Sequence, residues 1–372
     1  MTKLQTLYKR TKTGKIQEWT ICVDGDSFYT IEGIHKGKLT QNKPTVCKGK
    51  SIGRANETTG AEQALKEAQA KHDRKTEKNY TPDIKKVDQA NDDMHYEPML
   101  AEKFTKHEKK LVYPVITQRK SDGIRAIITK GDAISRNGKQ HKTIGHIQKA
   151  LEPFFKKFPD AILDGELYNH QLHDDFNKIA SLIRKQKPTK EELAEAKDMI
   201  EFHCYDAPRI GSFTEKDTFL KRYAIMSKEL KGVAHVEIVE NIMCNSKAEV
   251  IAQHDVFVED GFEGIMIRVD APYSNKRTKD LLKYKIFTTE EFELTDVREG
   301  KGNKIGLAAH ADCVMPNGKT FTANVKGPAW WRAELLKNKS SVIGKQATVK
   351  YFNLTPDGIP RFPYLLTIRD YE

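Results

Sequence analysis

The chain has 372 residues, of which 38% are hydrophobic, so it is long enough for two or three domains with cores of their own. No apolar run approaches the roughly 18 to 20 residues that cross a bilayer, and the basic N-terminal stretch lacks the apolar segment of a signal peptide, so no membrane partner is expected. The five scattered cysteines form no Cys-x-x-Cys pair, which argues against disulfides or zinc and favours a reducing, cytoplasmic compartment.

The net charge of +11 is concentrated near the N-terminus. Residues 1–80 hold 16 Lys and Arg against 9 Asp and Glu. A basic segment joined to a more balanced remainder is typical of a polyanion-binding module attached to an enzyme. Such a module would grip the nucleic-acid backbone in salt-dependent contacts that carry little sequence information. The alternative is that the charge serves solubility.

The basic segment predicts a β-hairpin followed by a helix. Apolar residues alternate through 19–23, stop at the Asp-Gly-Asp turn 24–26, and resume through 29–31. An N-cap at 56–59 precedes an Ala-rich, helix-favouring stretch at 61–75. The segment therefore predicts a small α+β module.

The stretch Gln-Arg-Lys-Ser-Asp-Gly-Ile-Arg places Lys120 between two predicted strands, 111–116 and 124–128. The lysine is therefore expected at a strand end or a tight turn, where function is often found. A lysine amine attacks only when unprotonated, and its free pKa is near ~10.4, so the site must lower that pKa by burial or nearby positive charge. Arg119 and Arg125 can supply such charge.

The residues after the lysine, Asp122 and Gly123, form a turn pair that lets the backbone approach a ligand. The alternative is an ordinary charged hairpin turn, because short motifs recur by chance. A second tight hairpin at 130–132 is expected to bring Arg136 back near Lys120. A helix predicted at 146–158 is assigned no chemistry.

A short apolar strand at 161–163 is expected to end at Asp164-Gly165-Glu166. A carboxylate at a strand end can bind a ribose hydroxyl or help to hold hydrated Mg²⁺, whereas the alternative for Glu166 is an exposed turn carboxylate. The amphipathic helix predicted at 176–185 begins with Phe176, for which a place in the core is the main alternative to a role on nucleic acid.

The strand predicted at 201–206 offers Tyr205 as an aromatic face for a base, with Phe202 as the fallback and a core tyrosine as the alternative. His203 and Cys204 are not expected to act as a pair, because adjacent strand residues point to opposite faces.

Surface helices are predicted at 213–230 and 248–259, followed by Glu263 ahead of a buried strand. The strand predicted at 281–286 places Lys283 and Lys285 on one face, which suits a pair of cations gripping a phosphate. The alternative is that both lysines decorate a surface.

The last 80 residues change to short strands broken by Gly-rich turns, which predicts a small Greek-key barrel of the OB kind. The predicted strands are 292–298, 313–315, 320–325, 347–352 and 364–369. Arg361 and Arg369 near the end are candidates for ATP or nucleic-acid phosphates, with solvated barrel arginines as the alternative.

Five motifs occur in a fixed order: Lys-x-Asp-Gly-x-Arg, Ser-Arg-Asn-Gly, Leu-Asp-Gly-Glu-Leu, Glu-Gly-Ile-Met-Ile-Arg and Leu-Lys-Tyr-Lys. Together they resemble the covalent nucleotidyltransferases, which include ATP-dependent DNA ligases, RNA ligases and mRNA capping enzymes. The closing stretch 360–370 resembles the ending of small viral ATP-dependent DNA ligases. The N-terminal hairpin and helix resemble a WGR domain, although the Trp-Gly-Arg triplet is missing and only Gly53-Arg54 echoes it.

The resemblance implies an ATP-dependent DNA ligase that uses ATP and Mg²⁺ and seals nicked duplex DNA through a lysyl-AMP intermediate. It implies Lys120 as the nucleophile, with Asp122, Lys283 and Lys285 also catalytic. The ATP-binding residues that it implies are Gln118, Arg125, Glu166, Tyr205, Phe202, Glu263 and Arg361, with Glu166 and Glu263 as metal ligands. For DNA it implies Arg136, Phe176 and Arg54. Ligases often end the fourth motif with lysine, so Arg268 is a departure whose ligand is open.

The expected fold class is α+β. It comprises a basic N-terminal module (1–82), a linker (83–100), a nucleotidyltransferase domain with antiparallel sheets (101–288) and an OB-fold domain (289–372). A monomer encoded by a virus or phage and acting in the host cell is expected. The alternatives are an RNA ligase or capping guanylyltransferase and, from another class, a non-catalytic nucleic-acid-binding protein.

Overall fold

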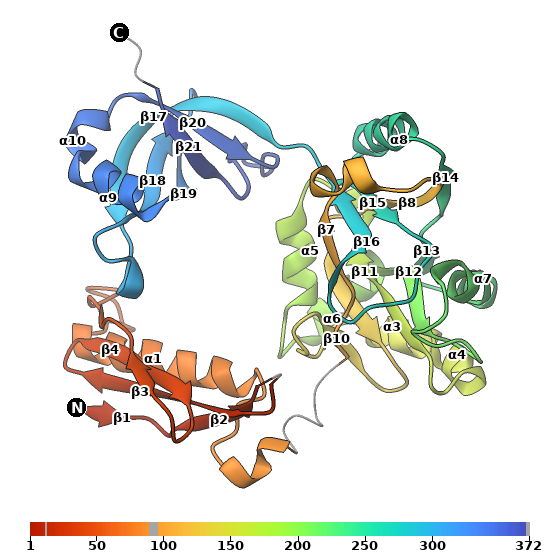
Figure 1. Ribbon diagram of the computed structural model, residues 1–372, viewed down its shortest axis with the longest axis horizontal. Coiled ribbons are helices and arrows are strands. Elements are labelled where there is room, and N and C mark those ends of the chain that lie inside the picture. Colours follow the sequence, from red (N-terminus) through yellow and green to blue (C-terminus); the bar gives the residue numbers. More distant parts are fainter. Residues whose placement is uncertain (12, 89–95, 370–372) are drawn as a thin grey trace. The chain divides into compact units, whose positions relative to one another are not determined.

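The computed structural model describes residues 1–11, 13–88 and 96–369 (Figure 1). The chain divides into two compact units, one formed by residues 1–94 with 287–372 and the other by 95–286. The division expected at 82, 100 and 288 stays a prediction, and the expected linker 83–100 lies partly outside the described residues. Within those residues, no helix has the length and apolar character needed to cross a membrane.

The N-terminal residues form an antiparallel sheet crossed by one helix. The predicted hairpin is confirmed, since β3 (Ile16–Asp24) pairs with β4 (Ser27–Ile34) and Asp24 lies opposite Ser27. The other strands are β1 (Thr2–Lys3), β2 (Leu7–Arg10), β5 (Leu39–Gln41) and β6 (Thr45–Val46). A short 3₁₀ helix, η1 (Ile84–Lys86), follows.

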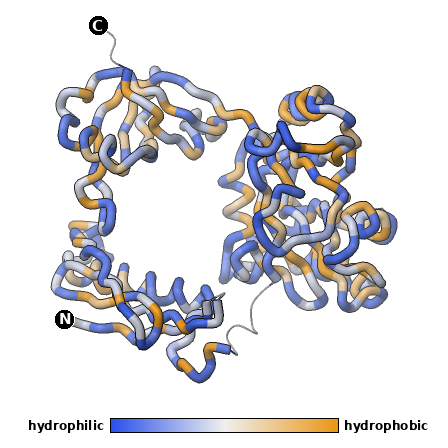
Figure 2. The backbone as a smooth tube through the Cα atoms, viewed as in Figure 1, coloured by the Kyte–Doolittle hydropathy of each residue, from blue (hydrophilic) through white to orange (hydrophobic). Residues whose placement is uncertain are grey.

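The predicted helix of this module is also confirmed as α1 (Gly60–Thr76). Thr59 caps it, because the Thr59 side chain accepts from the backbone of Glu62 while the Glu62 carboxylate accepts from the Thr59 backbone. The helix is mostly hydrophilic (Figure 2), and the alanines of its buried face, Ala64 and Ala68, belong to the same core as Trp19. A narrow apolar stripe is therefore enough to pack α1 on the sheet.

The unit 95–286 contains two five-stranded sheets. One has the order β14-β8-β15-β16-β7, and the other has the order β10-β9-β11-β12-β13. The strands are β7 (Leu100–Lys103), β8 (Val115–Lys120), β9 (Ile124–Ile128), β10 (Ala133–Ser135), β11 (Ile162–Tyr168), β12 (Glu201–Arg209), β13 (Val236–Ile238), β14 (Ile242–Cys244), β15 (Gly264–Arg268) and β16 (Arg277–Tyr284).

Helices cover these sheets and close their cores. They are α3 (Gly145–Ala150), α4 (Glu152–Lys157), α5 (Phe176–Ile183), α6 (Lys190–Met199), α7 (Phe219–Leu230) and α8 (Lys247–Glu259), with 3₁₀ helices η2 (Phe104–Lys106), η3 (Glu108–Lys110) and η4 (His170–Leu172). The largest core lies behind β9, β11 and β12, and a second core lies between α8 and the sheet that contains β8. The mixed α+β class is as predicted. The sheets are not purely antiparallel, however, because β12 pairs with β13 and β16 pairs with β7 in parallel.

Several predicted elements differ in detail. The single helix expected at 146–158 is two short helices, because Pro153 enters at the start of α4 and cannot donate a backbone hydrogen bond to the preceding turn. The helix expected at 213–230 begins only at Phe219, and α6 was not predicted. Glu166 lies inside β11 rather than after it, because the strand continues through an irregularity at Asp164 and Gly165.

The C-terminal residues form a closed five-stranded barrel with the order β17-β18-β19-β21-β20, as the OB prediction requires. The strands are β17 (Thr288–Glu299), β18 (Ala308–Val314), β19 (Thr320–Val325), β20 (Gln346–Tyr351) and β21 (Tyr364–Ile368). The helices α9 (Ala329–Lys337) and α10 (Lys339–Val342), which lie between β19 and β20 in the sequence, were not predicted; a 3₁₀ helix, η5 (Gly302–Lys304), follows β17.

Candidate active site

Lys120 is the last residue of β8 and pairs with Gly264, the first residue of β15. The strand end predicted for this lysine is therefore confirmed, although the strand is 115–120 and not the expected 111–116. Glu263 immediately precedes β15, and its backbone N–H donates to the carbonyl of Lys120 at 2.8 Å. The Glu263 carboxylate forms ion pairs with both the Lys120 amine and the Lys285 amine. Antiparallel pairing thus joins three residues that are far apart in sequence.

Burial and charge act in opposite directions on these groups. Burial alone would lower the pKa of Lys120, but the carboxylates of Glu263 and Glu166 outweigh it. The pKa of the amine is therefore raised in this structure, and not lowered as the sequence predicted. Burial would raise the pKa of Glu263, yet Lys120 and Lys285 together lower it. Burial and the neighbouring Lys120 lower the pKa of Lys283. In this state the Lys120 amine is therefore a protonated partner of Glu263.

Glu166 differs from Glu263 in charge state, because its pKa is raised and not lowered. Burial raises the pKa of its carboxyl group to about 8, and the attraction of Lys120 and Arg125 offsets this only in part. A carboxyl group with this pKa is mostly protonated at neutral pH. A nearby cation would favour its ionised form, because an opposite charge stabilises the carboxylate.

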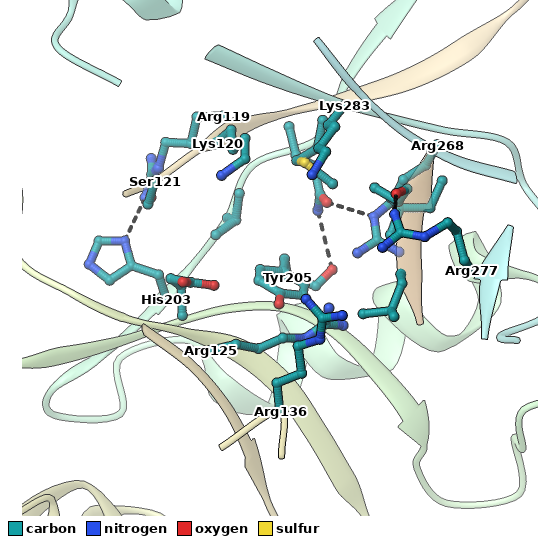
Figure 3. Close-up of a pocket in the computed structure, with 17 residues that line it drawn as sticks. Arg119, Lys120, Ser121, Arg125, Arg136, His203, Tyr205, Arg268, Arg277 and Lys283 are labelled. Carbon is teal, nitrogen blue, oxygen red and sulfur yellow. Dashed lines mark hydrogen bonds between the residues drawn. The ribbon is translucent and has the colours of Figure 1, made fainter. Parts of the chain in front are cut away.

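A cavity of about 230 Å³ contains Lys120 and Glu166 in its walls. Figure 3 shows Tyr205 near the middle, Arg119 and His203 at one end, and Arg268 and Arg277 at the other. The remaining lining residues are Leu100, Ala101, Gln118, Ser121, Arg125, Arg136, Val239, Met266, Leu281 and Lys283. Aromatic and apolar groups thus share one cavity with several cations, an arrangement that suits a base joined to phosphates.

Tyr205 and Phe202 lie on different faces of β12. Tyr205 lines the cavity, and the guanidinium groups of Arg125 and Arg268 lie 5.6 and 5.5 Å from the centre of its ring. Phe202 is fully buried in the core behind the sheet, so the fallback position is not brought to the cavity. The alternation of side chains along a strand accounts for the difference. His203, two residues before Tyr205, lines the cavity, whereas Cys204 belongs to the core.

Arg125 is held by a buried network. Its Nε donates to Asp164 at 2.8 Å and its Nη1 donates to the carbonyl of Met99 at 2.7 Å. The Tyr273 hydroxyl donates to the same Asp164 carboxylate at 2.7 Å and accepts from the backbone N–H of Met99 at 2.8 Å. The network fixes the arginine at the cavity wall, and neither Asp164 nor Tyr273 was predicted as a site residue.

Four other predicted residues do not line this cavity. Phe176 begins α5, with the Arg184 guanidinium 5.6 Å from its ring centre, and it does not line the cavity. Asp122 lies close enough to Lys120 to raise the pKa of that amine. Arg54 and Arg361 belong to the other unit, where Arg54 is exposed in a turn and Arg361 is buried in the barrel.

Sequence reasoning missed an ionic cluster at the Arg119 end of the cavity. Arg119 forms an ion pair with Glu237 and donates to Nδ1 of His203 at 3.4 Å. Since a guanidinium only donates, the His203 proton lies on Nε2, which faces Glu201 at 3.2 Å. Glu201, His203 and Glu237 have metal-like spacing, but this tautomer makes the cluster a hydrogen-bonded support for Arg119. The shared strand face of His203 and Tyr205 was the only signal for it.

Two family models match the chain. The ATP dependent DNA ligase domain matches residues 98–285, and the DNA ligase OB-like domain matches residues 299–369. The chain belongs to the ATP-dependent DNA ligases. The expected function, enzyme class and use of ATP are thereby confirmed, and the alternatives of an RNA ligase, a capping enzyme and a non-catalytic protein are set aside.

Alignments with known DNA ligases cover much of this chain. A DNA ligase of African swine fever virus is 28% identical over 395 aligned positions, which cover 94% of this chain and 90% of the viral protein. A DNA ligase of Haemophilus influenzae is 25% identical over 250 positions, covering 66% of this chain and 84% of the other. A solved structure of a Lig E DNA ligase has a TM-score of 0.61 at 22% identity, covering 74% of this chain and 100% of that one, which shows a shared fold.

Neither family match includes residues 1–97. The resemblance of the N-terminal module to a WGR domain therefore stays a prediction, as does its role on DNA.

Proposed function

We propose that the ligase seals nicks in duplex DNA through a covalent adenylate on Lys120. The Lys120 amine attacks the α-phosphorus of ATP, so that a phosphorus–nitrogen bond forms while the bond to the β-phosphate oxygen breaks and pyrophosphate leaves. An oxygen of the 5'-phosphate at the nick then attacks the same phosphorus and frees the lysine. The neighbouring 3'-hydroxyl finally attacks the 5'-phosphorus, and AMP leaves.

The observation that carries this proposal is the position of Lys120 at the end of β8, in a cavity wall shared with Tyr205 and cationic side chains. Each step is an attack on phosphorus, so positioning and cationic stabilisation are expected to supply most of the rate. Lys283 and Lys285 are assigned to the α-phosphate and Arg136 to the 5'-phosphate of the nick. Tyr205 is assigned to the base.

The carboxylates fit a divalent cation. Mg²⁺ prefers oxygen ligands, and Glu166 and Glu263 are two carboxyl groups beside the proposed nucleophile. The raised pKa of Glu166, about 8, also fits a group whose ionised form requires a further positive charge. Bound there, Mg²⁺ would supply charge neutralisation for the phosphates. Glu263 also affects the nucleophile in this scheme, because its ion pair with Lys120 must break before the amine can lose a proton and attack.

The proposal also covers the DNA substrate, the oligomeric state and the place where the enzyme acts. Nicked duplex DNA is the substrate partner, and the basic residues 1–82 act as a clamp on its backbone, with Arg54 among the contacts. A monomer is proposed. A virus- or phage-encoded enzyme acting in the host cytoplasm is proposed as well, and the relatives from African swine fever virus support its viral origin.

The experiment that tests the mechanism is incubation with α-labelled ATP and Mg²⁺, followed by a nicked duplex and by a matched RNA substrate. Lys120→Ala is expected to abolish labelling of the protein and to lower nick sealing by ~1,000-fold or more, as loss of a covalent nucleophile usually does. Lys130→Ala, at an exposed hairpin lysine, serves as the matched control and should label like the unaltered protein.

The Lys120 variant should still seal a nick whose 5' end already carries AMP, because the last step does not use the amine. A chelator should stop the labelling, and added Mg²⁺ should restore it. Efficient labelling of Lys120→Ala, or sealing of RNA in preference to DNA, would refute the proposal.

A further inference from the structure

Gln118 lies two residues before Lys120 on β8, on the same face of the strand, and lines the same cavity. Its side-chain amide has only one allowed orientation. The Nε of Arg268 donates to Oε1 of Gln118 at 2.7 Å, and Nε2 of Gln118 donates to the backbone carbonyl of Tyr205 at 3.2 Å. A guanidinium has no acceptor and a carbonyl has no donor, so exchanging the oxygen and nitrogen of the amide would break both bonds.

The donors of this amide are already used. Nε2 also donates to Oδ1 of Asn241 at 2.9 Å, which engages its second hydrogen. Oε1 has two lone pairs, and among the described residues Arg268 uses one of them. The polar capacity that Gln118 has left for a ligand is therefore that of an acceptor.

Arg268 is itself fixed in place. It ends β15, is almost fully buried, and donates from Nη1 to Asp206 at 3.0 Å. Its guanidinium lies 4.6 Å from the ring centre of Phe219. Arg222 also pairs with Asp206, through two contacts of 3.2 Å, so the buried carboxylate has two arginine partners. The donor that orients Gln118 is thus preorganised before any nucleotide arrives.

Purine bases differ at the position that such an acceptor would read. Adenine carries an amino group at position 6, which donates, whereas guanine carries a carbonyl oxygen there, which accepts. An acceptor held by the protein therefore pairs with the 6-amino group of adenine and repels the 6-carbonyl oxygen of guanine. A site built to pair with one polar group rejects an analogue that lacks it far more strongly than an apolar pocket can.

We propose that Arg268 is a positioning residue that makes the ligase prefer ATP to GTP, by holding Oε1 of Gln118 as the acceptor for the 6-amino group of adenine. The inference rests on the proposed function, because it requires the base to occupy the cavity beside Lys120. It also gives a role to the arginine at the end of the fourth motif, where ligases often carry lysine.

The first test uses the unaltered full-length protein and four nucleotides. Initial rates of covalent labelling are measured with ATP, GTP, ITP and the triphosphate of purine riboside, which has only hydrogen at position 6. The two 6-oxo nucleotides should have kcat/KM values ~100-fold or more below that of ATP, and purine riboside should lie between. Use of ITP within a few-fold of ATP would overturn the inference.

The second test compares Arg268→Met with Arg222→Met. Each variant leaves Asp206 with one arginine, but only the first removes the donor from Gln118. Arg268→Met should lower the ratio of kcat/KM for ATP over GTP by ~10-fold, mostly through KM for ATP, since losing one orienting hydrogen bond is typically worth about that factor. Arg222→Met should keep the ratio of the unaltered protein, and Arg268→Lys should recover part of it.

The outcomes separate this inference from the mechanism on which it rests. A purely structural Arg268 would lower the use of both nucleotides together, with the ratio unchanged, and that result would overturn the inference. An unaltered protein that is labelled by no nucleotide would instead refute the adenylate on Lys120. If Arg268→Met does not fold, Arg268→Lys decides in its place, because its ratio should fall below that of the unaltered protein, and an unchanged ratio would overturn the inference.

Discussion

At the residue scale, the largest loss of stability is predicted for a substitution of Asp164. Its fully buried carboxylate accepts from Arg125 and from the Tyr273 hydroxyl. Asp164→Asn leaves a buried guanidinium without its countercharge and should lower the free energy of unfolding by about 3 to 5 kcal/mol. Tyr273→Phe removes one hydrogen bond to the same carboxylate and should cost about 1 to 3 kcal/mol. Urea denaturation measures both, and a larger loss for Tyr273→Phe would contradict this reading of the network.

A second prediction at this scale concerns the loss of stability at acid pH that His146 causes. Burial lowers the pKa of His146, although its ring lies 2.9 Å from the carbonyl of Ile200, which opposes that change, and the nearby His235 and Lys197 add to the lowering. A histidine whose folded pKa is depressed stabilises the fold above its unfolded pKa, near ~6.5, and that stability is lost as the pH falls through this value towards the folded pKa.

The corresponding variant is His146→Gln, which cannot take up the proton. Urea titrations at pH 7.5 and 5.5 should show that the free energy of unfolding falls less on acidification in the variant than in the unaltered protein. Equal acid sensitivity of the two proteins would refute the assignment.

The residues of the site were predictable where a motif names them. Lys120, Glu263 and Lys285 were expected from motif order, and the structure joins them through ion pairs. The ion pair of Arg119 with Glu237 was not expected, because these residues meet only when strands of the two sheets come together, and no short-range pattern records that contact. Tyr205 and Phe202 were separable in principle, since only one of them can share a strand face with the ligand.

At the element scale, the motif glycines permit close strand pairing. A Cβ on Gly165 would lie 2.4 Å from the Phe202 ring and 2.6 Å from the carbonyl oxygen of His203. Gly165→Ala should therefore push β11 away from β12, displace the adjacent Glu166, and lower both thermal stability and covalent labelling. We expect a loss of about 1 to 3 kcal/mol, the usual cost of overpacking.

Gly145→Ala is the matched control for that variant. A Cβ on Gly145 meets nothing within 4 Å and the residue begins α3, where alanine is a good helix former. Thermal denaturation and labelling should leave this control close to the unaltered protein. Two alanine variants of equal stability and activity would refute the role given to Gly165.

Elements were predictable where a local signal was strong. The hairpin of β3 and β4 and the capped α1 follow from an Asp-Gly turn and a Thr-x-x-Glu box, and both are confirmed. The same box at Thr189 and Glu192 begins α6, so that helix could have been found. By contrast, the position of Glu166 within β11 depends on a strand irregularity stabilised by pairing on both sides, which no periodicity in the sequence reveals.

At the scale of the whole molecule, the proposed clamp should control the affinity for DNA without affecting the reaction of Lys120 with ATP. Residues 1–80 carry a net charge of +7 of the total +11, and Lys38, Lys48 and Arg54 are exposed on this module. Each contact between such a side chain and a phosphate releases a counterion and adds about 0.9 to the slope of log affinity against log salt concentration. Replacing all three by glutamine should therefore reduce that slope by up to ~3 for a nicked duplex.

The control must have the same net charge. Lys221, Lys228 and Lys231 are exposed on and after α7, in the other unit, and changing these three to glutamine removes an equal charge from a surface with no proposed DNA contact. Binding is measured at several salt concentrations, and labelling by ATP is measured without DNA. The clamp requires that the slope fall much more in the N-terminal variant than in the control, while both variants are labelled at the unaltered rate, because the amine and the nucleotide cavity belong to residues 95–286. Equal slopes in the two variants would mean that net charge, rather than this module, sets the affinity for DNA.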